Sequence, residues 1–115
     1  MQTALITHEA CMRHDMGAHH PECPQRLSAI EDRLIASGLA AVLARHVAPL
    51  ATNEQLERVH PPDYIEGIRR AAPSKGLIHL DPDTAMSPGT WEASLRAAGA
   101  VVLATDLVMT KQVAN

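Results

Sequence analysis

The alternation of apolar and polar positions along the chain predicts short strands separated by helices. Apolar, partly β-branched residues at 3–7 (TALIT) are typical of a buried strand. Residues 25–37 are predicted to form a helix, because Leu27, Ile30 and Leu34 fall on one face at helical spacing. A glycine follows directly, and glycine readily takes the left-handed conformation that ends a helix. The chain therefore begins with a strand, a polar connection and an amphipathic helix.

The middle of the chain carries signals for one more strand and two short helices. Residues 46–50 (HVAPL) form a candidate strand, placed at a sheet edge because Pro49 has no N–H to donate. Thr52 and Gln55 have the spacing of a capping box, which opens a short helix. A second helix is predicted over residues 62–72, bounded by prolines at both ends. Its inward-facing residues are expected to be Tyr64, Ile65 and Ile68.

The longest predicted helix covers residues 87–109. Ser87 is its expected N-cap, with Pro88 at the first helical position. Small residues at 97–100 would let a neighbouring segment pack closely against it. Residues 74–85, which precede this helix, are expected to be irregular.

Strands separated by helical segments imply an α/β fold with a parallel sheet. Residues 113–115 suggest the start of another strand. Two or three strands do not complete a parallel sheet, which is normally buried on both faces. We therefore expect the front portion of a larger domain, with uncovered apolar surface on the 93–109 helix and self-association through it.

Composition and charge narrow the class of protein further. The chain has 115 residues, 46% of them hydrophobic and only 2% aromatic, so any core must be aliphatic. A formal net charge of -3 argues against a nucleic-acid partner. No apolar run approaches the roughly 20 residues of a membrane span, which argues against a membrane protein. With no export signal and only two cysteines, a cytoplasmic location is expected.

Side chains capable of acid–base chemistry or metal binding are concentrated at positions 14–26 (HDMGAHHPECPQR). His14 beside Asp15 could form an acid–base pair, as could His19-His20 near Glu22, although such residues also commonly order a loop. A structural zinc site is a further alternative, since thiolate and imidazole ligands suit tetrahedral zinc. Its candidate ligands are Cys11, His14, His19 or His20, and Cys23.

Arg26 stands out because it lies in the first turn of the predicted helix that starts at Gln25. The helix dipole disfavours a cation at that end. The arginine is therefore either turned to solvent or held by an anion or by backbone carbonyls.

Four segments together resemble the zinc-dependent histone deacetylase family, especially its class II and bacterial acetoin-utilisation or acetylpolyamine-amidohydrolase branch. They occur in the family's order and extend over nearly the whole chain. They are His19-His20-Pro21-Glu22 with Pro24-Gln25-Arg26-Leu27; Glu54, Leu56, Val59, His60 and Tyr64; Leu80-Asp81 with Asp83-Thr84; and Ala97-Ala98-Gly99.

The resemblance implies a fold and roles for four residues. The family has the arginase-like three-layer α/β fold with a parallel sheet. By this likeness, His20 and Pro21 match rim positions of the substrate channel, and Asp81 matches a rim residue that accepts hydrogen bonds from the substrate. Arg26 matches the arginine beside the cavity through which acetate leaves.

The chain departs from the family by lacking its catalytic segments. The family's paired histidines follow a glycine-containing segment, and its zinc ligands and catalytic tyrosine come later; none matches a residue here. We therefore expect residues 1–115 to be the N-terminal part of a single deacetylase-like domain, truncated before the catalytic segment, with no catalytic residue and no metal ligand.

The expected parent is a hydrolase that removes acetyl groups from lysine or a polyamine through zinc-activated water. Zinc would be bound in the full-length family and not by this chain, which alone is predicted to be inactive. Two alternatives are a non-catalytic binding or assembly module and a small Cys/His zinc-binding domain.

Overall fold

The computed structural model describes all residues, 1–115. Its strands are β1 (Ala4–Thr7), β2 (Ala44–Val47), β3 (Ile78–Asp81) and β4 (Thr84–Met86). Its α-helices are α1 (Gln25–Ala36), α2 (Asn53–Glu57), α3 (Pro62–Ala71) and α4 (Thr90–Met109). Two 3₁₀ turns, η1 (Glu9–Arg13) and η2 (Leu39–Ala41), complete the order.

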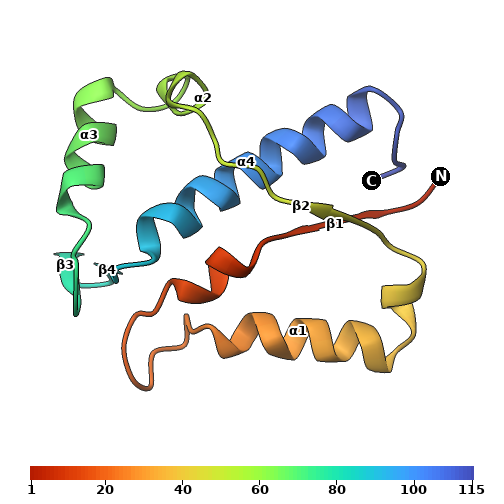
Figure 1. Cartoon of the computed structure of the whole chain (residues 1–115), viewed down its shortest axis with the longest axis horizontal. Helices are drawn as coiled ribbons and strands as arrows, with labels where there is room; N and C mark the ends of the chain where they lie inside the picture. Colours follow the sequence, from red (N-terminus) through yellow and green to blue (C-terminus); the bar gives the residue numbers. More distant parts are fainter.

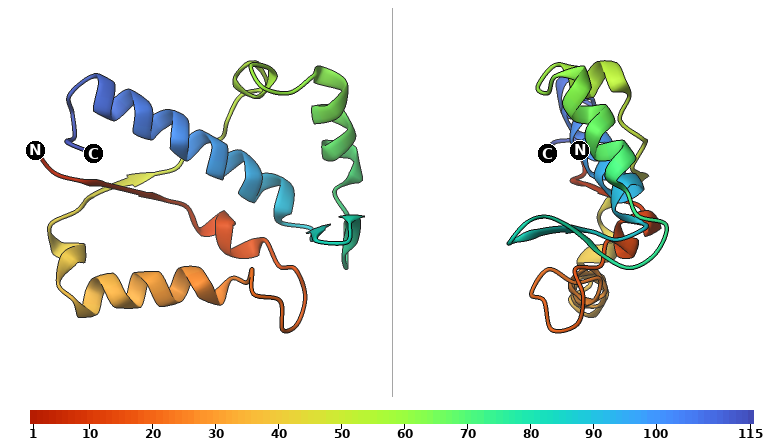
Figure 2. Two further views of the ribbon diagram at one scale, coloured as in Figure 1. Left: turned by 180° about the vertical axis from the view of Figure 1, so that it is seen from behind. Right: turned by 90° about the vertical axis from the view of Figure 1, so that its left-hand side faces the viewer.

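A parallel strand pair lies at the centre of the molecule. β1 pairs with β2 from Ala4 opposite Ala44 to Thr7 opposite Val47. α4 lies on one side of this pair and α1 on the other (Figures 1 and 2). The expected α/β fold with parallel strands is therefore confirmed, although β2 begins two residues earlier than expected and Pro49 lies beyond it.

The C-terminal residues lie along the other edge of β1. The Ala114 N–H donates to the Gln2 carbonyl at 2.9 Å, and the Ala4 N–H donates to the Asn115 carbonyl at 2.8 Å. Thr3 and Thr7 instead turn their carbonyls toward the β2 side, because neighbouring residues of a strand point their polar groups to opposite edges. The expected strand start at 113–115 is thus present as backbone pairing, without regular strand geometry.

The middle of α4 packs directly on the connection between β2 and α2. A Cβ atom on Gly99 would lie 2.0 Å from the Pro49 carbonyl oxygen. The Arg96 guanidinium donates to the Ala48 carbonyl at 2.9 Å, and the Ala51 N–H donates to the Leu95 carbonyl at 3.0 Å. The predicted close approach at 97–100 is confirmed.

Local signals also located α1 and α2 correctly. Gly38 follows α1 with a φ of 78°, the left-handed conformation expected at its end. Thr52 and Gln55 make both hydrogen bonds of the capping box at the start of α2.

Other expectations about local structure were wrong. Residues 78–86 form an antiparallel hairpin where an irregular segment was expected. α4 begins at Thr90 with Gly89 as N-cap, because the Ser87 side chain is engaged with the Arg13 backbone instead. Tyr64 does not face inward: it is 54% exposed, whereas its neighbour Ile65 is buried.

The molecule is flat and its apolar residues are incompletely covered. Its radius of gyration is 15.8 Å. A compact domain of this length would have a radius of about 13 Å. Only 12 of the 115 residues are buried and no large side chain is fully enclosed, so the chain does not complete a core. On α4, Val101 is 67% and Met109 is 75% exposed, as the sequence predicted for this helix. None of the helices has both the length and the apolar character needed to span a membrane.

Candidate functional site

The polar loop of residues 14–24 connects η1 to α1 at the end of the molecule opposite the two termini (Figure 1). The β3–β4 hairpin lies at the same end (Figure 2). The two segments meet where Gly17, with a φ of 97°, faces the Leu77 side chain; a Cβ there would lie 3.2 Å from Leu Cδ1. The loop and the segment that leads into the hairpin are therefore in contact.

Behind the loop, a hollow of about 310 Å³ opens between η1, α1 and α4. Its polar side chains differ in chemistry: a thiol, an imidazole, a carboxylate, a guanidinium and a hydroxyl. They belong to Cys11, His14, Glu22, Arg26 and Ser94, and the apolar wall is formed by Leu27, Ala93 and Ala97. An apolar wall with a few convergent polar groups is the usual character of a ligand site.

Arg26 is held by an anion from its own chain. Its guanidinium lies 3.3 Å from the carboxylate of Glu22, four residues earlier in the loop, and its side chain is 48% exposed. Arg26 is therefore paired with a carboxylate at the mouth of the hollow, which is one of the environments that the sequence left open. The exposed pair contributes little to stability by itself.

His14 is fixed by the start of α4 and not by its neighbour Asp15. Its Nδ1 lies 2.8 Å from the Thr90 hydroxyl, while the Asp15 carboxylate accepts the Gly17 N–H. The expected His14–Asp15 acid–base pair is therefore absent. Since Thr90 lies 76 positions further along the chain, nothing in the sequence pattern pointed to this partner.

A small buried network joins the loop to α4 at this point. The Ser87 hydroxyl donates to the Arg13 carbonyl at 3.0 Å and accepts the Asp15 N–H at 3.1 Å. The Thr90 hydroxyl accepts the Ser87 N–H at 2.8 Å. Both hydroxyl residues are buried, and the bond between the Thr90 hydroxyl and the Ser87 N–H is made away from competing water. The network fixes the position of the loop relative to the hollow.

The residues predicted for the rim lie on this face but do not converge on one cavity. His20 is half-buried and Pro21 is exposed at the end of the loop. Asp81 is exposed on the hairpin, where its carboxylate accepts the Asp83 N–H at 2.8 Å. The hollow that contains Arg26 is lined by neither His20 nor Asp81.

The expected pairing of His19-His20 with the Glu22 carboxylate is also absent. The His20 ring instead accepts the Glu22 backbone N–H at 3.0 Å, and the carboxylate of that glutamate binds Arg26. These contacts order the loop.

The structure does not assemble a metal centre from these side chains. No group of three or more His, Cys, Asp or Glu residues is placed to hold an ion. Cys11 and Cys23 are half-buried free thiols. The residues present therefore do not fit a zinc ion, and the small Cys/His zinc domain is not favoured.

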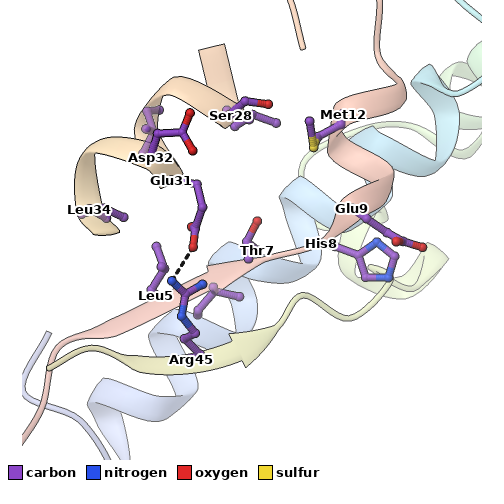
Figure 3. Close-up of a pocket in the computed structure, with 13 residues that line it drawn as sticks. Leu5, Thr7, His8, Glu9, Met12, Ser28, Glu31, Asp32, Leu34 and Arg45 are labelled. Atoms are coloured by element: carbon purple, nitrogen blue, oxygen red, sulfur yellow. Dashed lines mark hydrogen bonds and ion pairs between the residues drawn. The ribbon is translucent and has the colours of Figure 1, made fainter. Parts of the chain in front are cut away.

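A second, larger hollow of about 550 Å³ separates α1 from the β1–β2 pair (Figure 3). Leu5, Ile30 and Leu34 contribute apolar surface to it. The Glu31–Arg45 ion pair joins α1 to β2 across it (Figure 3). Arg26 does not line this space, because its side chain is on the side of α1 that faces Glu22 and α4.

Comparison with solved structures defines the fold class. The structure titled "Crystal Structure of HDA15 HD domain" superposes with a TM-score of 0.87 at 24% sequence identity, covering 100% of this chain and 34% of that one. The chain therefore has the fold of about one third of that α/β domain.

Sequence comparison identifies the family. The sequence profile of the histone deacetylase domain matches residues 20–115. The "Histone deacetylase-like amidohydrolase" of Pseudomonas aeruginosa is 30% identical, covering 99% of this chain and 34% of the relative. The human "Polyamine deacetylase HDAC10" is 32% identical over 100% of the chain and 18% of the relative. A "Probable deacetylase" of Archaeoglobus fulgidus is 28% identical over 100% of the chain and 32% of its own length.

The chain belongs to the histone deacetylase family, as its motifs had indicated. It spans about a third of the length of the Pseudomonas and Archaeoglobus relatives.

Proposed function

We propose that the chain is the N-terminal part of a single zinc-dependent deacetylase domain, to which it contributes scaffold and substrate rim. The observation that carries this proposal is the family match over residues 20–115 in a chain whose fold corresponds to one third of a deacetylase domain. The non-catalytic assembly module remains the second candidate, supported by the exposed apolar residues of α4.

The proposed roles of four residues rest on their match to positions of the family, and their places in the fold are compatible with these roles. The polar loop, which contains His20 and Pro21, and the β3–β4 hairpin, which contains Asp81, lie at the same end of the molecule (Figure 2). The proposed substrate entrance is at this end. An exposed carboxylate such as that of Asp81 can accept hydrogen bonds from a substrate backbone. Arg26 lines the hollow behind the loop, where a guanidinium can bind a departing carboxylate such as acetate.

The proposed substrate is an acetylated lysine or polyamine. The proposal is supported by the similarity of the chain to a histone deacetylase-like amidohydrolase and to a polyamine deacetylase. A cytoplasmic location agrees with the two free thiols.

The metal would be bound elsewhere in the domain. No group of side chains in this chain fits zinc, so the ion and the water that it activates would be held by residues that this chain does not contain. The chain by itself is therefore proposed to be inactive.

A chimeric enzyme tests the proposal. Residues 1–115 would replace the matching first third of the Pseudomonas amidohydrolase, and zinc content, circular dichroism and hydrolysis of an acetyl-lysine substrate would be measured. We expect a folded, zinc-loaded and active chimera. A chimera that does not fold, or that binds zinc without turnover, would contradict the equivalence of the two segments.

Matched variants of the chimera test the rim residue. Asp81→Asn is expected to raise KM about tenfold, the loss of one charge-assisted hydrogen bond. Asp83→Asn, two residues away on the same hairpin, is the control and is expected to leave KM unchanged. Equal effects of the two substitutions would remove the proposed role of Asp81.

A further inference from the structure

Two histidines hold the two ends of the segment 8–22, which runs from the end of β1 through η1 and the polar loop. At its start, His8 is the N-cap of η1, and its Nδ1 accepts the Ala10 N–H at 3.0 Å. Near its end, the His20 Nδ1 accepts the Glu22 N–H at 3.0 Å. In both, a ring nitrogen accepts from the backbone two residues further on.

The backbone N–H groups that donate to His8 and His20 determine which nitrogen of each ring carries the proton. A backbone N–H can only donate, so each Nδ1 must carry a lone pair and the ring proton must be on Nε2. The contact between His14 and Thr90 gives no such assignment, because a hydroxyl can donate or accept. His8 and His20 are therefore the two histidines whose structural hydrogen bonds require a neutral ring.

We propose that His8 and His20 form a pH-sensitive latch on the segment 8–22. A protonated ring carries hydrogen on both nitrogens and cannot accept either backbone bond. Histidine is the side chain that ordinarily gains a proton between pH 8 and pH 5. Acidification through that range breaks both bonds and frees the turn at each end of the segment.

The charged groups around each ring come from several elements. The hollow that contains His8 also presents Glu9 from η1, Glu31 and Asp32 from α1, and Arg45 from β2 (Figure 3). On the α4 side of η1, Arg13 lies 3.5 Å from Glu92. His20 is flanked by His19 and by Glu22, whose carboxylate is paired with Arg26.

Release of His8 exposes a buried part of the structure. Ala10 is fully buried, and its N–H donates to the His8 ring and not to a backbone carbonyl. Beyond it, Gly89 packs so closely on Arg13 that an added Cβ would lie 2.4 Å from the arginine Cβ. η1 therefore cannot shift without disturbing the start of α4.

Amide hydrogen exchange of the 115-residue chain between pH 8 and pH 5 measures this latch directly. After correction for the intrinsic pH dependence of exchange, the Ala10 and Glu22 amides are expected to lose protection as pH falls. The loss should approach about tenfold per pH unit below the midpoint if one proton is taken up. Long-range ¹⁵N–¹H spectra at pH 8 should show both rings with hydrogen on Nε2.

Asparagine variants separate titration from mere instability. The Asn side chain also accepts an N–H two residues on, but it does not titrate in this range. H8N/H20N should therefore retain protection at pH 8 and lose its dependence on pH. The control is His79→Asn, at an exposed histidine of β3, which should keep the wild-type dependence.

Three outcomes would overturn the latch: an Nδ1–H tautomer at either ring, protection of Ala10 and Glu22 that stays constant down to pH 5, or an unchanged pH dependence in H8N/H20N. Because the readout is exchange and not turnover, failure of the latch is distinguishable from failure of the deacetylase assignment.

Discussion

At the scale of single residues, the contacts that shape the candidate site are made across long stretches of sequence. The Ser87 hydroxyl holds the backbone of Arg13 and Asp15, and the Thr90 hydroxyl holds the His14 ring. The composition of the loop identified it as chemically important. It could not reveal these partners, because serine and threonine before a helix are ordinarily interpreted as caps.

The Thr90→Val substitution tests the buried network. Valine keeps the shape of threonine but leaves the His14 ring and the Ser87 N–H without their partner. We expect the free energy of unfolding to fall by about 1–3 kcal/mol, measured by urea denaturation. Thr105→Val is the control, because that hydroxyl is exposed and bonds only its own helix; a loss as large as that of T90V would contradict the role of the network.

Glu66 provides a test of exposed electrostatics. Hydrogen bonds from the Arg69 side chain, and then from Arg70, lower the pKa of Glu66 from 4.5 to about 2. Since the folded pKa is depressed, its contribution to stability is present above pH 4.5 and is lost as pH falls through about 2. Carboxyl ¹³C titration should show the low value, and Arg69→Gln should raise it more than Arg70→Gln. A midpoint near 4.5 in the wild-type chain would be inconsistent with these ion pairs.

At the scale of elements, the structures that the sequence predicted well are those with local causes. α2 is specified by its own capping box and α1 by its apolar stripe and Gly38. The β3–β4 hairpin escaped prediction because its pairing is interrupted between His79 and Asp81, which obscures the alternation of a regular strand pair. The start of α4 was misplaced because a tertiary contact occupies Ser87.

Two glycines in helices give a matched test of close packing. Gly99→Ala would place a Cβ against the Pro49 and Ala51 backbone, so we expect a loss of about 1–3 kcal/mol of stability despite the better helix propensity of alanine. Gly67→Ala, in α3 with open space around it, should instead gain up to about 1 kcal/mol. Thermal denaturation of both variants checks the prediction, and stabilisation by G99A would refute the close approach.

At the scale of the whole molecule, the chain leaves apolar surface uncovered. The strand pair has helices on both sides, yet few side chains are enclosed and α4 exposes Val101 and Met109. The sequence indicated this from the small number of strands. It could not show that the C-terminal residues already pair with the β1 edge.

Self-association of the isolated chain follows from that surface. Sedimentation velocity should show a weight-average mass above that of the monomer that rises with concentration. Val101→Lys should reduce it, whereas Val59→Lys, at an exposed apolar residue that is not part of α4, should not. Monomeric behaviour at every concentration would mean that the exposed face of α4 does not self-associate.

We propose that the chain contributes the rim and scaffold of a deacetylase and none of its metal chemistry. The most direct measurement is hydrolysis of acetyl-lysine and acetylpolyamine substrates by the purified 115-residue chain, with and without added zinc. The Pseudomonas amidohydrolase would serve as the positive control. We predict no turnover by the chain in either condition. Zinc-dependent turnover that survives repurification would contradict the claim.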